Sequence, residues 1–363
     1  MTSRKEQTAE NGHQVTFLPF DVEIKVPAGI KILEAANIAH LPLKTTCGGK
    51  GTCGDCVVQI VQGSYKKKPS ASLSDHLANQ GYALACQTEI RGDLSVLLPQ
   101  FRELNIKSII DSRFFDEQKD KISGIYKVDP LVKSVNIKLP SPTLEDNYSD
   151  LKRLMRELQN MLRLDNLHIE YSVLRRLAHT IREKQEHINV ILFNPGAQPT
   201  VIDISPGSEK KHMCGIACDI GTSTVALHLV DLFKGEILAS SSSFNQQIKC
   251  GDDIISRINY AKKPGYLEEL QKLIVLTINN LIEKTSCLAK VSSSDIYYAS
   301  FSGNTTMIHL LLNLEPRFIR EEPYVPTFNQ VPFILSRDLG LKMNPEARIY
   351  CSPAVGSYVG GDI

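Results

Sequence analysis

The spacing of four cysteines near the start of the chain limits what this sequence can fold into more than any other feature. The pattern is C-x5-C-x2-C, followed after twenty-nine residues by a fourth cysteine. An iron–sulfur cluster needs four thiolates on one small surface, and three can come from one loop only if its backbone bends sharply. The intervening glycines permit such bends and let backbone N–H groups approach the sulfides. The predicted cluster ligands are Cys47, Cys53, Cys56 and Cys86.

Two other interpretations of these cysteines compete with a cluster. A structural zinc site usually uses two C-x2-C pairs or a mixture of cysteine and histidine, whereas this segment contains one C-x2-C. Unligated core cysteines are the second alternative. The loop TTCGGKGTCGDC instead resembles that of the 2Fe-2S ferredoxins of the adrenodoxin type, whose first gap is also five residues. The four-residue gap of plant-type ferredoxins does not match.

The hydrophobic pattern of residues 14–100 predicts a small β-grasp domain around this loop. Two strand-like runs precede apolar residues at helical spacing, and further strands follow the cysteines. The expected elements are strands over Gln14–Phe20 and Asp21–Val26, a helix from Ile32 to Ala39, a strand over Cys56–Val61, a short helix near Asp75–Asn79 and a strand over Leu94–Leu98.

Composition argues against some partners and indicates a compartment. The 363 residues carry a formal net charge of +1, which gives no reason to expect nucleic acid or an anionic membrane as a partner. No run of eighteen apolar residues is present, so no membrane span is predicted. Nine cysteines, unevenly spread, do not look like a secreted disulfide framework and indicate a reducing cytoplasm. The polar residues 1–13 are expected to form a disordered tail.

Residues 101–211 are interpreted as a connector and a scaffold. Residues 101–125 are charged and only intermittently apolar, which predicts a linker with a short helix. Residues 126–211 predict an α+β middle domain, whose scattered histidines lack the spacing of metal ligands. Its expected elements are a strand from Tyr126 to Leu139, an amphipathic helix carrying Leu151, Leu154 and Leu158 on one face, a helix over Tyr171–Lys184, and strands over Ile188–Phe193 and Pro199–Ser205.

A turn rich in glycine and hydroxyl residues opens the last part of the chain, residues 212–363. It joins a buried strand, Gly215–Ile220, to a returning strand, Val225–Val230. Such a turn can aim backbone N–H groups at phosphate oxygens, and Asp219 at the strand end can hold Mg²⁺ through water. The GK[ST] element of a Walker A loop is absent. An ordinary hairpin capped by Asp219 is the alternative.

The same turn resembles the first phosphate loop, D-x-G-T-x-x, of the fold shared by actin, hexokinase, acetate kinase and heat-shock chaperones. This resemblance implies a partial actin-like (ribonuclease H-like) ATPase domain over residues 212–363, with Asp219 as its catalytic residue. It also implies that nucleotide is bound by Gly221, Thr222, Ser223 and Thr224.

Two later junctions admit both a functional and a capping interpretation. An acidic pair, Asp252 and Asp253, opens a helix, where carboxylates suit the helix dipole. A strand over Ile296–Phe301 passes through Ser302-Gly303-Asn304-Thr305-Thr306 into a helix, where anions can bind. The other expected elements are a strand over Glu236–Ser241, a long helix over Leu267–Lys284 and a helix beginning near Gly356.

Motifs from the whole chain occur together in the order of one family. They are LEDNYSDLKRL, DIGTSTVALHLVDL, NQQIKCGDDIISRINYA, SGNTTMIHLLL and SPAVGSYVGGDI. With the cysteine loop, they resemble the reductive activators of corrinoid proteins over residues 14–363. The resemblance implies that the 2Fe-2S cluster takes an electron from a low-potential donor. It also implies that ATP and Mg drive the return of a methyltransferase system's corrinoid protein from Co(II) to Co(I).

The resemblance further predicts that the actin-like part is incomplete. No second D-x-G-T is present, and members of the family continue into a second nucleotide-binding lobe. We therefore expect the chain alone to bind ATP weakly or not at all. A fragment of a longer protein, a second chain that completes the fold, and a decayed reading frame are the three explanations. Whether the chain alone is an enzyme stays open, and the alternatives are a plain 2Fe-2S electron-transfer protein and a kinase with an attached cluster.

The sequence thus predicts a multidomain α+β and α/β protein. Its predicted parts, in order, are a β-grasp 2Fe-2S ferredoxin domain, a linker, an α+β middle domain and part of an actin-like ATPase domain.

Overall fold

The computed structural model divides the chain into two units, which are described separately. One unit comprises residues 1–109 with 246–260, and the other comprises residues 110–245 with 261–363. The linker predicted over residues 101–125 and residues 1–11 of the predicted tail lie outside the described residues, whereas Gly12 and His13, also assigned to that tail, begin a strand because they pair with the next strand. The structure describes residues 12–18, 22–39, 41, 43, 47–68, 72–98, 128–164, 166–183, 187–196, 198–207, 212–251, 253–356 and 359–361.

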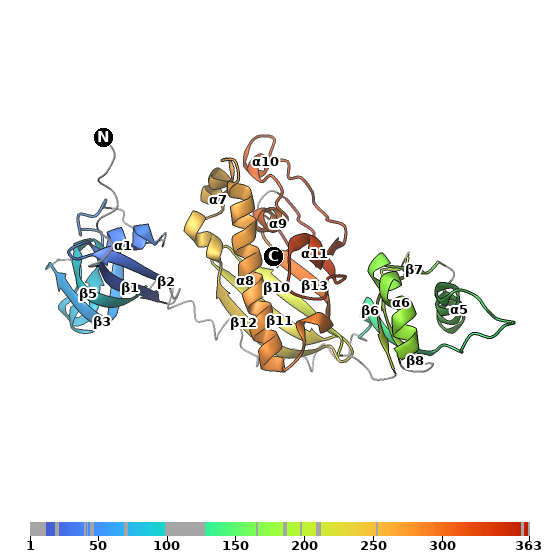
Figure 1. Cartoon of the computed structure of the whole chain (residues 1–363). Helices are drawn as coiled ribbons and strands as arrows, with labels where there is room; N and C mark the ends of the chain where they lie inside the picture. Colours follow the sequence, from blue (N-terminus) through green and yellow to red (C-terminus); the bar gives the residue numbers. More distant parts are fainter. Residues whose placement is uncertain are drawn as a thin grey trace, which may run out of the picture. The chain divides into compact units, whose positions relative to one another are not determined.

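The first unit contains a five-stranded sheet of the β-grasp type (Figure 1). Its elements are β1 (Gly12–Leu18), β2 (Val22–Pro27), α1 (Ile32–Ile38), β3 (Val57–Lys67), α2 (Asp75–Asn79), β4 (Tyr82–Leu84), the 3-10 helix η1 (Ala85–Gln87) and β5 (Thr88–Leu97). The strand order is β2-β1-β5-β3-β4. β1 pairs antiparallel with β2 and parallel with β5, and α1 contacts η1 and β5.

The core of this sheet explains where two of the cysteines lie. Side chains alternate along β1, so Val15 and Phe17 are buried while Thr16 between them is half-buried. The same core cluster includes Cys56 and Cys86, which are 1% and 0% exposed. These two thiols therefore lie in the core of the sheet.

β3 is longer than the sequence predicted, because Gly63 does not end the strand, and its partner β5 begins earlier than predicted, at Thr88. β3 was expected to stop at Val61, but it continues to Lys67. Its pairing with β5 is irregular between Ile60 and Gln62 and again between Gly63 and Tyr65. Gly63 has φ of 121°, and a side chain there would overlap the carbonyl of Asp93. A glycine that reads as a strand end is here a bulge within one strand.

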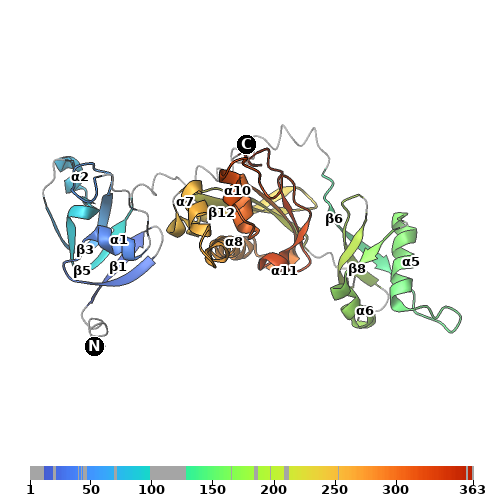
Figure 2. The ribbon, with the colours of Figure 1, turned by 90° about the horizontal axis from the view of Figure 1, so that it is seen from above.

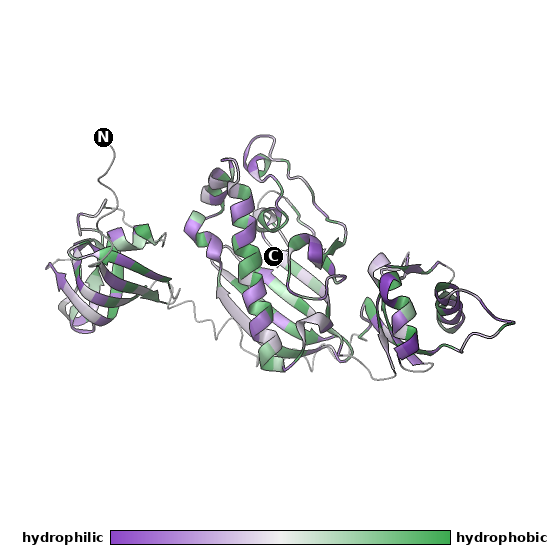
Figure 3. Ribbon diagram, in the orientation of Figure 1, coloured by the Kyte–Doolittle hydropathy of each residue, from purple (hydrophilic) through white to green (hydrophobic). Residues whose placement is uncertain are grey.

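The second unit begins with a small α+β region over residues 128–207. Its elements are β6 (Val132–Lys138), α5 (Asp150–Leu162), β7 (His168–Ile169), α6 (Tyr171–Glu183), β8 (His187–Phe193) and β9 (Thr200–Pro206), with strand order β6-β8-β9-β7. The apolar faces of both helices join the core of this sheet, as Leu154, Leu158 and Leu177 show. Figure 3 shows the matching alternation of hydrophilic and hydrophobic residues along α6. The two-residue β7 was not predicted, since it is too short to show a period.

A six-stranded sheet dominates the rest of the chain. Its elements are β10 (Cys214–Ile220), β11 (Thr224–Asp231), β12 (Glu236–Phe244), α8 (Tyr266–Ala289), η4 (Ser293–Asp295), β13 (Ile296–Gly303), α9 (Thr305–Leu311), α10 (Arg317–Arg320), β14 (Ile334–Leu335), α11 (Ser336–Leu339) and β15 (Arg348–Cys351). The strand order is β12-β11-β10-β13-β15-β14. β10 is antiparallel to β11 and parallel to β13, which is parallel to β15. α8 covers β11 and β12 (Figures 1 and 2).

The two sheets of the second unit share a buried cluster. Ile191 and Ile202 of the smaller sheet pack with Tyr297 of β13, which is 0% exposed. The hydroxyl of Tyr297 donates to Oδ2 of Asp203 at 2.6 Å, and Arg176 pairs with Oδ1 of Asp203 at 2.7 Å. The smaller sheet is therefore packed directly on the larger one.

Two helix predictions near functional motifs have different outcomes. The segment Gln246–Tyr260 of the first unit contains η3 (Gln246–Cys250), and α7 (Ile254–Ala261) begins there. Asp253 caps α7, because its Oδ1 accepts from the N–H of Ser256 at 2.7 Å; Asp252 lies outside the described residues. The helix expected near Gly356 is wrong for residues 356 and 359–361, which form no helix. There the carbonyl of Val359 accepts the N–H groups of Val355 and Gly356 instead.

Candidate functional site

The cysteine loop between α1 and β3 is shaped by glycines. Four of them have positive φ: 61° at Gly48, 84° at Gly49, 79° at Gly51 and 81° at Gly54. A residue with a side chain would cost roughly 1–2 kcal/mol at such a position. The loop can therefore fold back on itself and present its backbone N–H groups to one side.

Those N–H groups meet the first cysteine. The Sγ atoms of Cys47 and Cys53 are 3.3 Å apart. The backbone N–H of Cys53 is the main cause that lowers the pKa of the Cys47 thiol to about 5, and the Cys53 thiol and the N–H groups of Thr52 and Gly51 add to it. The thiolate is the form of cysteine that binds metal. This end of the loop thus favours a thiolate at Cys47.

The other two thiols form a second pair, linked to the first. Burial raises the pKa of the Cys56 thiol to about 11, and the neighbouring Cys86 and Cys53 also act on it. A buried thiol that resists ionisation becomes a thiolate ligand when a bound cation offsets the charge. Cys56 therefore lies between the pair in the loop and Cys86 from η1.

The donor set fits a binuclear cluster. Within the part of the chain that the structure describes, no three His, Cys, Asp or Glu side chains converge as a single metal ion would need. Two linked pairs of thiols suit a 2Fe-2S cluster, in which each iron takes two protein ligands. The predicted cysteines thus form two pairs, Cys47 with Cys53 and Cys56 with Cys86, and Cys53 also acts on Cys56. Their role as ligands stays a prediction.

The predicted phosphate loop lies at one edge of the larger sheet. β10, β13 and β15 are parallel, so their carboxyl ends share this edge. Asp219 is exposed there and pairs in register with Ser302 of β13. A side chain on Gly221 would come within 2.7 Å of the carbonyl oxygen of Thr224, so the hairpin requires glycine. Thr222, Ser223 and Thr224 are half-buried in the same turn.

Loops distant in sequence close around this edge. The hydroxyl of Thr305 donates to the carbonyl of Gly356 at 2.6 Å, and that of Ser302 donates to Gly361 at 2.5 Å. Asn304 caps α9, because its Oδ1 accepts from the N–H of Thr306 at 2.9 Å. The capping interpretation of this junction is therefore confirmed.

One residue that supports the phosphate loop was not singled out from the sequence. Asn245, directly after β12, donates its side-chain N–H to the carbonyl of Gly221 at 3.0 Å. Its backbone N–H donates to the carbonyl of Ser223 at 2.9 Å. Asn245 opens the motif NQQIKCGDD, but the sequence gives no sign that it contacts a loop more than twenty residues earlier.

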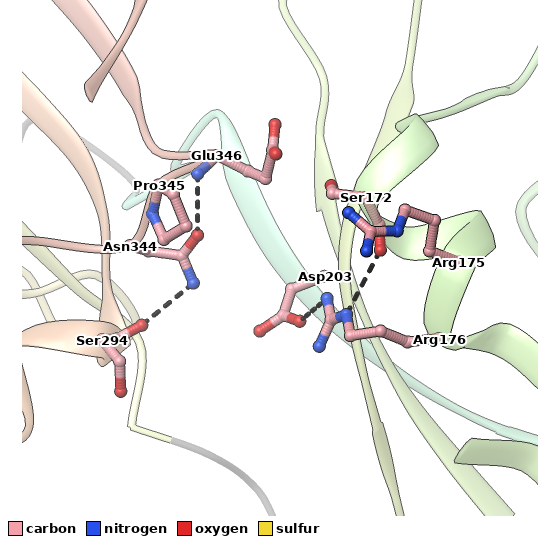
Figure 4. A pocket seen from close by; sticks show the side chains of 8 residues that line it. All are labelled: Ser172, Arg175, Arg176, Asp203, Ser294, Asn344, Pro345 and Glu346. Carbon is pink, nitrogen blue, oxygen red and sulfur yellow. Dashed lines mark hydrogen bonds and ion pairs between the residues drawn. The ribbon is translucent and has the colours of Figure 1, made fainter. Parts of the chain in front are cut away.

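A cavity elsewhere in the second unit contains none of these residues. Its volume is about 580 Å³, and its lining includes Arg176 and Asp203 together with Asn344 and Glu346 (Figure 4). Figure 4 shows Arg176 directed at Asp203 and Asn344 directed at the Ser294 carbonyl. Two pairs of lining residues are hydrogen-bonded to each other, Arg176 with Asp203 and Asn344 with Ser294, and we assign the cavity no role in the chemistry.

Three family descriptions match the chain in order. A 2Fe-2S iron–sulfur cluster binding domain matches residues 15–91, the RACo linker region matches 123–211, and the RACo middle region matches 214–363. The first match contains all four cysteines. The fold and the site thus define an iron–sulfur protein with a ferredoxin-type domain joined to an actin-like sheet.

Known relatives identify the family more closely. A corrinoid activation enzyme, RamQ of Eubacterium limosum, is 29% identical over 357 residues, which are 96% of this chain and 54% of the relative. A solved structure titled reductive activator for corrinoid,iron-sulfur protein is 36% identical with a TM-score of 0.61, covering 96% of this chain and 56% of the other. The chain belongs to the family of reductive activators of corrinoid proteins, and it spans about half the length of these relatives.

A more distant likeness concerns the first domain alone. A component of the Na⁺-translocating NADH-quinone reductase of Haemophilus influenzae is 35% identical over 79 residues, which are 21% of this chain and 19% of that relative.

Among the helices of the described residues, none has the length and hydropathy of a membrane-spanning segment.

Proposed function

We propose that this chain carries electrons in the ATP-dependent reductive activation of a corrinoid protein. The proposal rests on the presence of two features in one chain. The first is the loop with its four cysteines and its glycines of positive φ, and the second is a sheet of actin-like strand order with a turn beginning at Gly221. The first part can hold one electron, and the second part can respond to a nucleotide.

In this proposal the cluster is held by Cys47, Cys53, Cys56 and Cys86. Once bound, the cluster supplies one-electron chemistry. The N–H groups around Cys47 favour negative charge on its sulfur, and burial of Cys56 and Cys86 keeps water from that side. The electron comes from a low-potential donor and passes to the cobalt of the corrinoid protein, which returns from Co(II) to Co(I) for methyl transfer.

ATP with Mg supplies the driving force in the proposal. Each 30 mV of uphill one-electron transfer costs roughly 0.7 kcal/mol, half of the two-electron figure. Asp219 would hold Mg²⁺ through water, and the turn Gly221–Thr224 would contact phosphate. An actin-like fold closes on its nucleotide between two lobes. We therefore propose that nucleotide binding also needs residues beyond this sequence, from a longer chain or from a second chain.

The test is the anaerobic reduction of a Co(II) corrinoid protein, which is monitored by visible absorbance with and without ATP and Mg. The chain carries its cluster and a chemical low-potential reductant is in excess. A longer form or a completing chain is included in a parallel reaction. We expect ATP-dependent formation of Co(I) there, and Asp219→Ala should abolish most of that dependence. Asp338→Ala, at an exposed position of α11, is the matched control.

Equal reduction with and without ATP in both reactions would contradict the proposal. That outcome favours the second candidate function, a plain 2Fe-2S electron carrier. The similarity of residues in the first domain to a component of an NADH-quinone reductase supports that candidate. A chain that holds no iron at all would contradict both.

A further inference from the structure

The side chain of Gln87 reaches from the sheet to the cysteine loop. Gln87 directly follows Cys86 in η1. Its Nε2 donates to the carbonyl oxygen of Gly49 at 2.8 Å and lies 3.6 Å from the Sγ of Cys86, within the range of an N–H···S hydrogen bond. The amide nitrogen carries two hydrogens, so one group can serve both acceptors.

One backbone contact and one side-chain contact define the position of Gln87. The backbone carbonyl of Gln87 accepts from the N–H of Lys68 at 3.1 Å, which ties η1 to the end of β3. A side chain on Gly51 would come within 2.8 Å of Cγ of Gln87. The absence of a side chain at Gly51 therefore makes the room that Gln87 occupies.

The orientation of the amide follows from its partner. The group nearest to it in the loop is the carbonyl oxygen of Gly49, which can only accept a hydrogen bond. The nitrogen of the Gln87 amide, and not its oxygen, must then face the loop. The same orientation directs an N–H toward the sulfur of Cys86.

We propose that Gln87 is a positioning residue of the iron–sulfur site, which ties the cysteine loop to Cys86 and makes the cluster easier to reduce. The inference rests on the proposed function, since it requires that Cys86 be a ligand. A reduced cluster carries one more negative charge than an oxidised one. An N–H donated to a ligand sulfur stabilises that extra charge, which raises the reduction potential.

The cysteine sulfurs receive their hydrogen bonds from different parts of the chain, and this difference is the physical reason for the proposal. Cys47 and Cys53 belong to the glycine-rich loop, where backbone N–H groups reach the sulfur of Cys47. Cys86 comes from η1, which is not part of that loop in the sequence. Gln87 supplies a side-chain donor at the fourth sulfur, and its bond to Gly49 holds the loop and η1 at a constant separation.

The test is the midpoint potential of the cluster, measured on the full chain by mediated redox titration. Gln87→Leu keeps the bulk of the side chain and removes both hydrogen bonds. At a fixed potential, we expect the ratio of reduced to oxidised cluster to be about three to ten times lower than in the wild type. For one electron, this corresponds to a midpoint potential lower by about 28 to 59 mV. Gln87→Glu should lower the potential further, because it places an acceptor and a charge near Cys86.

Gln59→Leu is the matched control. Gln59 lies in β3 and donates to the carbonyl of Gln80 at 3.2 Å. We expect this variant to keep the wild-type potential. A second readout is amide hydrogen exchange over Gly48–Gly51 in the chain without iron, which should be faster in Gln87→Leu than in Gln59→Leu.

The outcomes separate this inference from the proposed function. If the wild-type chain shows no 2Fe-2S absorbance and no iron, the proposed function fails. If the wild-type chain holds the cluster and both Gln87 variants keep its potential, only the role of Gln87 in tuning is overturned. Should Gln87→Leu fail to assemble a cluster, unchanged exchange over Gly48–Gly51 would overturn the anchoring role, and faster exchange would support it.

Discussion

The cysteine loop and the edge of the larger sheet that carries the predicted phosphate loop, called the phosphate edge below, use glycine in different ways. In the cysteine loop, four glycines with positive φ bend a short segment so that its own N–H groups surround a sulfur. At the phosphate edge, Gly221, Gly303 and Gly360 make room for neighbouring backbone, because a side chain at each would collide with a carbonyl oxygen. The first arrangement is local in sequence, as is the contact of Gly221 with Thr224, whereas the contacts of Gly303 and Gly360 exist only once the sheet has formed.

The cysteines of the two regions differ in the same way. The pKa of Cys47 is lowered by nearby N–H groups, chiefly that of Cys53. In the larger sheet, burial raises the pKa of Cys214 and of Cys351 to about 12. Cys218 is 3% exposed, and its pKa is likewise raised by burial. Cysteine therefore serves as a candidate ligand in one region and as a small core residue in the other.

The largest effect is expected when a cysteine of the loop is replaced, with an exposed cysteine outside the loop as the control. Cys53→Ser should abolish the visible absorbance of the cluster and nearly all bound iron, because a hydroxyl is a poor substitute for a thiolate. Cys287→Ser, at an exposed position of α8, should leave both unchanged. Iron and sulfide content per chain checks the prediction. Normal iron in Cys53→Ser would show that the ligand set is wrong.

A pair of glycine variants sharpens the comparison within the loop. Gly51→Ala adds a methyl group 2.8 Å from Gln87 and strains a backbone with φ of 79°. Gly48→Ala meets nothing within 4 Å, although its φ of 61° is also left-handed. Both should therefore lose roughly 1–2 kcal/mol of loop stability from the backbone, but Gly51→Ala should lose its cluster faster.

The half-life of the visible absorbance in the presence of an iron chelator measures this difference. Equal half-lives for the two variants would mean that the contact with Gln87 contributes nothing to cluster retention.

Sequence reasoning reached the cysteine loop more completely than the phosphate edge. The spacing of Cys47, Cys53 and Cys56 and the glycines between them are contiguous, so a pattern of residues was enough to predict the loop. Gln87 was missed, because a hydrogen bond to a residue thirty-eight positions earlier leaves no pattern in the sequence. The strand after Gly63 was also missed, since a bulge and a turn use the same residue.

At the phosphate edge, the sequence predicted the strands but not what surrounds them. The hairpin at Gly221 was expected, whereas the support from Asn245 depends on β12 returning beside β11. The helix expected near Gly356 was wrong among the described residues, because its backbone groups bond to Val359 and Thr305. Such contacts depend on the order of strands in the sheet, which hydrophobic periodicity does not reveal.

A third comparison concerns the two sheets of the second unit, which the buried Tyr297 joins. Tyr297→Phe removes a hydrogen bond to the carboxylate of Asp203, which keeps Arg176 as its partner. A lost bond to a charged group costs about 1.5–3 kcal/mol, so the free energy of unfolding should fall by that amount. Tyr298→Phe is the control, because no hydrogen bond of its hydroxyl is found in the part of the chain that the structure describes. Chemical denaturation checks the prediction, and equal midpoints for the two variants would contradict it.

The smallest expected effect is a pH dependence of the larger sheet. His309 of α9 is 0% exposed. Its Nδ1 donates to the carbonyl of Thr305 at 2.7 Å, and its Nε2 accepts from the N–H of Thr327 at 3.1 Å. This arrangement requires the neutral ring. Burial lowers the pKa of His309, although the Thr305 carbonyl acts in the opposite direction, and burial also lowers the pKa of His228.

Because the pKa of His309 is lower in the folded chain, the unfolded chain binds its proton at higher pH. The stabilising contribution is therefore complete above about 6.5, the ordinary pKa of histidine, and is lost as the pH falls from there through the lower pKa of the folded chain. His309→Gln should flatten the fall in melting temperature between about pH 6.5 and 5, whereas His179→Gln, at an exposed position of α6, should not. If the melting temperature falls equally steeply with pH in the two variants, the acid sensitivity belongs to other groups, His228 first among them. The burial of His309 would then not be the cause of the pH response.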